Sequence, residues 1–237
     1  MKDKGVGRRD FLKSAVVGGA AAASGTIATP QPAAAQAPAV PTALPPATYA
    51  FLNLEEAAFV EALVDHMIPA DDLTPKGTDL GINIYIDRAL AGAWGKGDRL
   101  YMQGPWKPGV PSQGYQLPLT PAQLYRAGIT ATNAHCRKTY GKTFEKLAEP
   151  QREEVLVGLS TAKVTFDDGP PVRVFWSTVY QTVMEGMFSD PIYGGNRNKA
   201  GWRMIGFPGA LAVHRENVEK YRGKKFPVDP VGIADMS

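Results

Sequence analysis

Residues 119–141 read "LTPAQLYRAGITATNAHCRKTYG" and contain a complete set of helix signals. Thr120 is typical of a helix N-cap, Pro121 suits the first helical position, and Gln123 completes a capping box. Gly141 is typical of a helix C-terminus. Between these ends, one face at helical spacing carries Tyr125, Gly128, Ile129, Thr132, Cys136 and Tyr140. The segment therefore predicts a long helix with one buried face.

Helical periodicity recurs on both sides of this segment. We expect further helices at about residues 54–68, 80–91, 150–163, 170–188 and 209–222. Asn53 and Glu56 form a capping box at the start of the first of these. The β-branched residues of the fourth also suit a strand, but the length of its pattern favours a helix. The connections are rich in Pro and Gly. The predicted fold class is mostly α, a single irregular helical domain with long Pro/Gly-rich loops.

The first 37 residues have the pattern of a twin-arginine export signal. Arg8 and Arg9 precede Phe11 and Leu12, and a short apolar run interrupted by glycine follows. We predict a periplasmic protein with three parts: a twin-Arg signal peptide (1–37), a Pro/Ala linker (38–50) and a helical accessory-subunit domain (51–237). An uncleaved anchor and a basic, disordered terminus are the alternatives.

The composition excludes several classes of function. The formal net charge of +3 comes entirely from the signal, so the exported chain is neutral and has no excess of basic residues for nucleic acid. The single cysteine, Cys136, excludes an internal disulfide framework, a C-x-x-C-H haem site and a four-cysteine iron–sulfur site. After the signal, no apolar run is long enough to span a membrane.

Residues 186–209, "GMFSDPIYGGNRNKAGWRMIGFPG", form what we call the glycine segment. Its six glycines indicate a backbone with several sharp turns. Its aromatic residues would bury enough area to fix the segment in place. Because long structured loops commonly serve recognition, we expect this segment and the loop around Trp106 to contact a partner. The candidate partner-binding residues are Trp106, Phe188, Tyr193, Asn196, Arg197, Trp202 and Phe207.

Together with "MIPADDLTPKGTDLGINIYIDRALAG" (residues 67–92), the glycine segment resembles the gluconate 2-dehydrogenase subunit 3 family. Members are the small, or gamma, subunits of membrane-associated sugar and gluconate dehydrogenases. The resemblance covers most of the exported chain, and residues 190–209 are its most specific part. It implies a non-catalytic subunit without a cofactor of its own. It also implies an FAD-carrying large subunit of the glucose–methanol–choline type as partner, and commonly a multihaem cytochrome. The large subunit would be exported bound to this chain, so the twin arginines would direct both.

A search for catalytic patterns agrees with that implication. The chain has no strand–GxGxxG–helix unit, no G-K-[ST] phosphate loop and no G-x-S-x-G motif. His66 falls on an apolar helix face and is expected to be a core histidine with a satisfied partner. His135 and Cys136 are neighbours on a helix, where side chains diverge by about 100°. A free-standing periplasmic enzyme and a homodimeric binding module remain the alternative functions.

Cys136 has two possible states in an exported protein, a buried free thiol or an intermolecular disulfide. Its place on the apolar helix face favours the buried thiol. Arg137 and Lys138 follow directly, and positive charge favours the thiolate that attacks in disulfide exchange. We predict a disulfide to the large subunit, with the buried thiol as the alternative.

Overall fold

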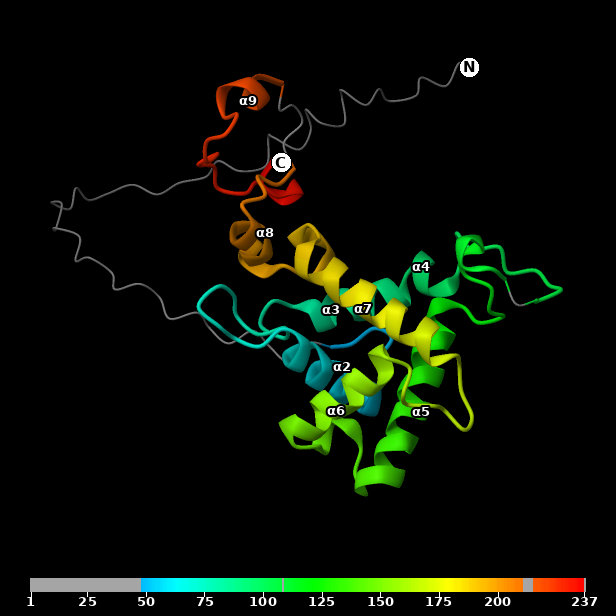
Figure 1. Ribbon diagram of the computed structural model, residues 1–237. Helices are drawn as coiled ribbons and strands as arrows, with labels where there is room; N and C mark the ends of the chain where they lie inside the picture. The colour runs from blue at the N-terminus through cyan, green and yellow to red at the C-terminus, as the bar shows by residue number, and fades with distance from the viewer. Residues whose placement is uncertain (1–47, 108, 211–214, 237) are drawn as a thin grey trace, which may run out of the picture. The chain divides into compact units, whose positions relative to one another are not determined.

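The computed structural model describes residues 48–107, 109–210 and 215–236. The predicted signal peptide, with Arg8, Arg9, Phe11 and Leu12, lies outside the described residues. The described part is mostly helical and contains no strand, which confirms the predicted fold class. Figure 1 shows the helices in their spatial arrangement.

The elements follow in chain order. The α-helices are α2 (Leu54–Met67), α3 (Ile82–Ala91), α4 (Ala93–Lys96), α5 (Pro121–Tyr140), α6 (Glu149–Ser160), α7 (Val172–Phe188), α8 (Ala200–Ile205) and α9 (Arg215–Lys220). Single turns of 3-10 helix are η1 (Pro111–Gln113), η2 (Phe144–Lys146), η3 (Pro191–Tyr193), η4 (Arg197–Lys199) and η5 (Ile233–Met236).

The helix ends follow the capping signals of the sequence. The Asn53 side chain accepts a hydrogen bond from the Glu56 amide at 2.9 Å, and the Glu56 carboxylate accepts one from the Asn53 amide at 3.0 Å. Thr120 and Gln123 exchange the equivalent pair of bonds at the start of α5. Gly141 ends α5 in the left-handed conformation, with φ of 72°. These bonds satisfy amide groups that a helix terminus otherwise leaves unpaired.

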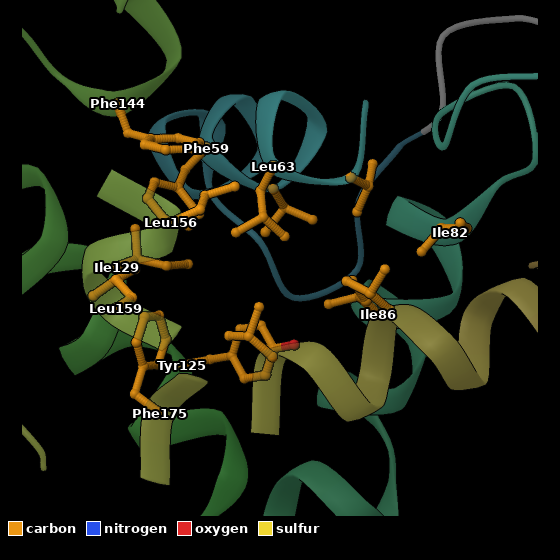
Figure 2. Packing of buried hydrophobic residues seen from close by; sticks show 14 of the residues in the cluster. Phe59, Leu63, Ile82, Ile86, Tyr125, Ile129, Phe144, Leu156, Leu159 and Phe175 are labelled. Atoms are coloured by element: carbon orange, nitrogen blue, oxygen red, sulfur yellow. The ribbon is translucent and has the colours of Figure 1, made fainter. Parts of the chain in front are cut away.

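The core lies among five helices. Helix α7 packs against α3, α5 and α6, and α2 packs against the same three helices. Figure 2 shows 14 of its side chains and labels Phe59, Leu63, Ile82, Ile86, Tyr125, Ile129, Phe144, Leu156, Leu159 and Phe175. The rings of Phe59 and Phe144 have their centroids 4.8 Å apart. The buried Tyr125 hydroxyl is hydrogen-bonded to the Thr182 hydroxyl, so α5 and α7 also share a polar contact.

The folded domain begins within the predicted linker. The buried Asp87 carboxylate of α3 accepts hydrogen bonds from the amides of Ala50, Phe51 and Leu52 at 2.7–2.9 Å. The Tyr49 hydroxyl donates to Glu61 at 2.5 Å. Charged acceptors make the strongest protein hydrogen bonds, so this chain segment is fixed against α3 before α2 begins.

The last predicted helix is confirmed in part. We expected it over residues 209–222, and α9 covers Arg215–Lys220, while residues 211–214 lie outside the described residues. Gly209 instead has a φ of 87° and forms an isolated parallel bridge with Val231. A β-carbon at this glycine would lie 2.1 Å from the Val231 carbonyl oxygen, so the C-terminal chain passes directly over it. Within the described ranges, no helix has both the length and the apolar character that crossing a membrane requires.

Candidate partner-binding surface

The part of the glycine segment that follows α7 lies against the C-terminal end of this helix, with the two backbones in direct contact. A β-carbon at Gly195 would lie 2.1 Å from the Gly186 carbonyl oxygen of α7, so only glycine permits this approach. The Arg197 amide donates to the Leu80 carbonyl at 3.0 Å, which joins the segment to the residues before α3. The segment is therefore held against both α7 and the residues before α3.

Asn196 holds the turns of the glycine segment together. Its side chain is fully buried, with 0% of its surface exposed. The amide nitrogen donates to the Ser189 carbonyl, and the amide oxygen accepts from the Gly201 amide, both at 2.9 Å. Its backbone is left-handed, with φ of 46°, a conformation that asparagine tolerates better than most residues. We therefore correct its assignment from a partner contact to an internal link.

Trp202 and Phe188 also have anchoring roles. Trp202 is only 4% exposed, and its indole N–H donates to the Phe188 carbonyl at 2.6 Å. Phe188 is half-buried and packs against the core cluster. The Trp202 ring meets Phe207 edge to face, with centroids 5.3 Å apart. The buried Trp202 ring thus packs against Phe207, and Phe207 is the more exposed ring, which a partner can reach.

The C-terminal tail is fastened to the same segment. Asp190 accepts hydrogen bonds from the Ile192 amide at 3.0 Å and from the Ile233 amide at 2.8 Å. Lys199 forms an ion pair with Asp235, with 2.6 Å between nitrogen and oxygen. These contacts hold the C-terminal tail against the glycine segment, although the paired residues are more than 35 positions apart in the chain.

This anchored region exposes many large apolar side chains, which we call the apolar surface. Its members are Ile192, Tyr193, Met204, Ile205, Phe207, Val228, Ile233 and Met236. Tyr193 and Ile205 are more than half exposed, at 55% and 57%. Phe207 and Val228 line a pocket of about 380 Å³ beside Trp202. Among the predicted partner-binding residues, Tyr193 and Phe207 are accessible on this surface.

Two arginines flank Gly194 of the glycine segment. The half-buried Arg197, a predicted contact residue, lies beside Gly81, where a β-carbon would be 2.8 Å from its Nε. Arg88 of α3, which the sequence did not single out, lies beside Gly194, where a β-carbon would be 3.0 Å from its Nη1. It shares a pocket with Tyr85 and Tyr193. No local sequence signal could have placed α3 there, because more than 100 residues separate Arg88 from Tyr193.

Trp106 belongs to a different part of the molecule. It is half-buried in the loop between α4 and α5, which Figure 1 shows away from α8. Tyr101 of the same loop is 80% exposed, and Trp94 of α4 is 37% exposed. Trp106 therefore cannot share one small contact area with the glycine segment, and its role as a contact stays a prediction.

Cys136 is fully buried and has a free thiol. Burial, together with the Glu145 carboxylate, raises the pKa of this thiol to about 11, although Arg137 acts in the opposite direction. A protonated, inaccessible thiol is a poor nucleophile. These facts favour the buried-thiol alternative, and the disulfide to a large subunit stays a prediction that requires α5 to open.

The other chemistry-bearing residues have structural partners. His66 is 11% exposed at its side chain and lies 2.7 Å from the Glu153 carboxylate, as a satisfied histidine should. Asp71 accepts hydrogen bonds from the amides of Thr74 and Leu73, and these bonds, which are typical of a turn, lower its pKa. Over the described residues, no cluster of three or more His, Cys, Asp or Glu side chains could hold a metal ion.

Comparison with known proteins identifies the family. No curated protein and no solved structure is significantly similar to this chain. The family model for gluconate 2-dehydrogenase subunit 3 matches residues 54–209, from the start of α2 to the end of the glycine segment. The matched range covers more than half of the chain and includes every α-helix of the core. The chain therefore belongs to the gluconate 2-dehydrogenase subunit 3 family.

Proposed function

We propose that this chain is the non-catalytic small subunit of an FAD-dependent sugar or gluconate dehydrogenase. It binds the large subunit, which carries FAD and is of the glucose–methanol–choline type. It escorts that subunit to the periplasm by the twin-arginine route and stabilises it there. A multihaem cytochrome is a further candidate partner, and the membrane is reached only through the complex.

The observation that carries this proposal is an apolar surface on a well-anchored segment. Large apolar side chains that gather on the outside of a domain mark a site for a partner. Here the backbone beneath them is held by Asn196, Asp190 and Asp235, so the surface exists before the partner arrives. A preformed surface loses less conformational freedom on binding. Family membership supports a partner within a gluconate dehydrogenase complex.

Charge also suits association with a large protein. The exported chain carries no formal net charge once the first 37 residues are set aside. It therefore adds little long-range repulsion to an encounter with a protein of either sign. Binding would depend on apolar contact and on a few local charges, and such interfaces typically bury about 2,000 Å² or more when they are permanent.

The export part of the proposal is tested by replacing Arg8 and Arg9 with Lys in the full chain. Both proteins should then remain in the cytoplasm, because the large subunit is proposed to have no signal of its own. Cell fractionation with dehydrogenase assay and immunoblotting of both subunits measures this. The control variant replaces Lys2 and Lys4 with Arg, which keeps the charge and the twin arginines. A normal periplasmic level of flavoprotein in the Arg8→Lys/Arg9→Lys cells would contradict the escort role.

Purification of the native complex tests the subunit role. This chain, tagged at its C-terminus, should co-elute with a flavoprotein that shows FAD absorption and dehydrogenase activity. The isolated chain should be colourless and inactive. Dehydrogenase activity in the isolated chain would favour the free-standing enzyme, and a stable dimer of this chain without flavoprotein would favour the homodimeric module.

A further inference from the structure

The C-terminal half of α3 and the start of the glycine segment enclose a pocket of about 440 Å³. Its lining from α3 includes Tyr85 and Arg88, and its lining from the glycine segment includes Ser189, Asp190, Ile192 and Tyr193. Ile192 and Tyr193 also belong to the apolar surface, so the pocket opens beside that surface.

Arg88 supplies an unpaired positive charge to this pocket. Over the described residues, its guanidinium forms no ion pair and no hydrogen bond, although carboxylates are near. Asp190 is occupied by the amides of Ile192 and Ile233. Glu185 is occupied by the Tyr85 hydroxyl at 3.2 Å and by Gln181 at 2.8 Å.

The backbone leaves room for the Arg88 guanidinium beside Gly194. A β-carbon at Gly194 would lie 3.0 Å from Nη1 of Arg88, and the φ of Gly194 is 107°. The positive φ favours glycine at this position, and the missing β-carbon leaves space for the guanidinium. Ser189 adds a second polar group, because its hydroxyl oxygen is buried and has no hydrogen-bond partner among the described residues. An unpaired hydroxyl and an unpaired guanidinium on residues that line one pocket suit an added acceptor.

The walls of the pocket are aromatic and aliphatic. Burial and the nearby Glu185 carboxylate raise the pKa of Tyr85 to about 12, so its phenol stays neutral. Tyr193 is 55% exposed and Ile192 is 49% exposed, so their apolar surfaces remain uncovered. Arginine and tyrosine are the residue types that most often carry the binding energy of protein interfaces.

We propose that this pocket binds a carboxylate side chain, an Asp or Glu, presented by the large subunit. The proposal rests on the proposed function above and names the chemistry by which the partner is recognised. Arg88 pairs with the carboxylate through its planar guanidinium, which fits two oxygen atoms at once. Tyr193 and Ile192 are covered by the residues on either side of that carboxylate.

Two features favour a protein carboxylate over a free anion. A small ion would leave Tyr193 and Ile192 exposed, whereas a protein chain covers them. A phosphate would bring two negative charges close to Glu185 and Asp190, and Arg88 is the one arginine among the lining residues that could balance them. A carboxylate brings one charge, which one guanidinium neutralises.

The test measures assembly of the purified large subunit with variants of this chain. Arg88→Glu should weaken binding by roughly thirtyfold or more, since breaking a desolvated charge pair removes one of the stronger interface contacts. Arg88→Gln should weaken binding less and should make it less sensitive to salt. Arg173→Glu is the matched control, because Arg173 is exposed on α7 outside the pocket and undergoes the same charge change. Its binding should stay within about twofold of the unmodified chain.

The outcomes separate this inference from the proposed function. If the unmodified chain binds the flavoprotein and Arg88→Glu and Arg88→Gln bind equally well, the pocket proposal is wrong and the subunit role stands. If the unmodified chain binds no flavoprotein, the proposed function itself fails. A single Asp→Arg or Glu→Arg change in the large subunit that restores binding to Arg88→Glu would identify the carboxylate. Arg88 is exposed, so circular dichroism and thermal unfolding of each variant should match the unmodified chain.

Discussion

The helical core and the glycine segment are held together by different means. The core is fixed by large apolar side chains such as Phe59, Phe144 and Phe175, which are 0–1% exposed. The glycine segment is fixed by the buried Trp202 and by a few polar side chains that bond to backbone groups, chiefly Asn196 and Asp190. The first region keeps its apolar groups inside, whereas the second leaves several of its own outside.

This difference separates stability from recognition within one domain. Apolar burial supplies most of the free energy that holds a domain folded. A segment that is held by hydrogen bonds can keep a fixed shape without burying its apolar side chains, and those side chains then remain available to a partner. Truncation of an aromatic ring in the core should therefore lower the stability of the fold more than it weakens assembly. The same truncation in the glycine segment should weaken assembly more than it lowers stability.

The largest expected effect comes from a pair of phenylalanine substitutions. Phe175→Ala removes a fully buried ring of α7 and should cost about 3–5 kcal/mol of unfolding free energy. Phe207→Ala removes a ring that is 44% exposed and should cost about 1 kcal/mol or less in the isolated chain. Urea unfolding of both variants measures this difference.

Assembly should show the reverse order once both variants are folded. Phe207→Ala should weaken binding of the large subunit by about tenfold, since truncation of a central interface ring commonly costs more than 1 kcal/mol. Phe175→Ala should bind normally at low temperature, where it is still folded. A Phe207→Ala variant that unfolds as easily as Phe175→Ala would show that the apolar surface is part of the core, and the comparison would fail.

The two regions also differ in how far the sequence predicts them. Helix periodicity and capping are local patterns, so α2 and α5 could be located from Asn53, Glu56, Thr120 and Gly141 alone. The turns of the glycine segment could be anticipated from their glycines. The hydrogen-bond partners of Asn196 could not be anticipated, because they depend on the three-dimensional course of a backbone that has no repeating pattern.

Contacts between distant residues account for the rest of what was missed. Arg88 and Tyr193 line one pocket because α3 packs beside Gly186 near the end of α7 and η3 follows that end, and no spacing in the sequence encodes this. Gly209 was placed at the start of a helix because Ala210 and the residues after it suit a helix locally. The bridge to Val231 overrides that preference, and only the course of the C-terminal chain reveals it.

An intermediate effect is expected at Asn196, inside the glycine segment. Asn196→Ala leaves the Gly201 amide and the Ser189 carbonyl without this partner and places alanine at a φ of 46°. The loss should be about 2–4 kcal/mol, from unpaired buried groups and from left-handed strain. Because the segment can open without the core, hydrogen exchange should accelerate across residues 189–205 and not in α5.

Asn196→Gly is the matched control for this substitution. Glycine tolerates the left-handed backbone, so this variant should recover about 1 kcal/mol relative to Asn196→Ala while still lacking both hydrogen bonds. Equal exchange rates in the two variants would mean that the backbone conformation contributes nothing. Faster exchange throughout α5 and α7 would mean that the glycine segment is part of the cooperative core, which would contradict the separation of the two regions.

The smallest effect at neutral pH is expected at Cys136, inside the core. Cys136→Ala should cost about 1 kcal/mol at pH 7, because it removes one buried sulfur atom. The folded thiol has a pKa raised by burial to about 11, so it keeps its proton at pH values where the unfolded thiol has lost it. Between about pH 9 and 11 the folded state therefore binds more protons, and rising pH favours unfolding. Relative to Cys136→Ala, the unmodified chain should lose stability across this window.

The same thiol decides between the two states that the sequence left open. A buried thiol should react with a maleimide at pH 8 only as fast as α5 opens, and a complex with blocked thiols should separate into two subunits on a denaturing gel without reductant. A band at the summed mass of both subunits that disappears on reduction would establish the predicted disulfide. In that case α5 must open on assembly, since Cys136 is fully enclosed in the isolated chain. The core would then take part in recognition, and the division between a stable region and a binding region would no longer hold at α5.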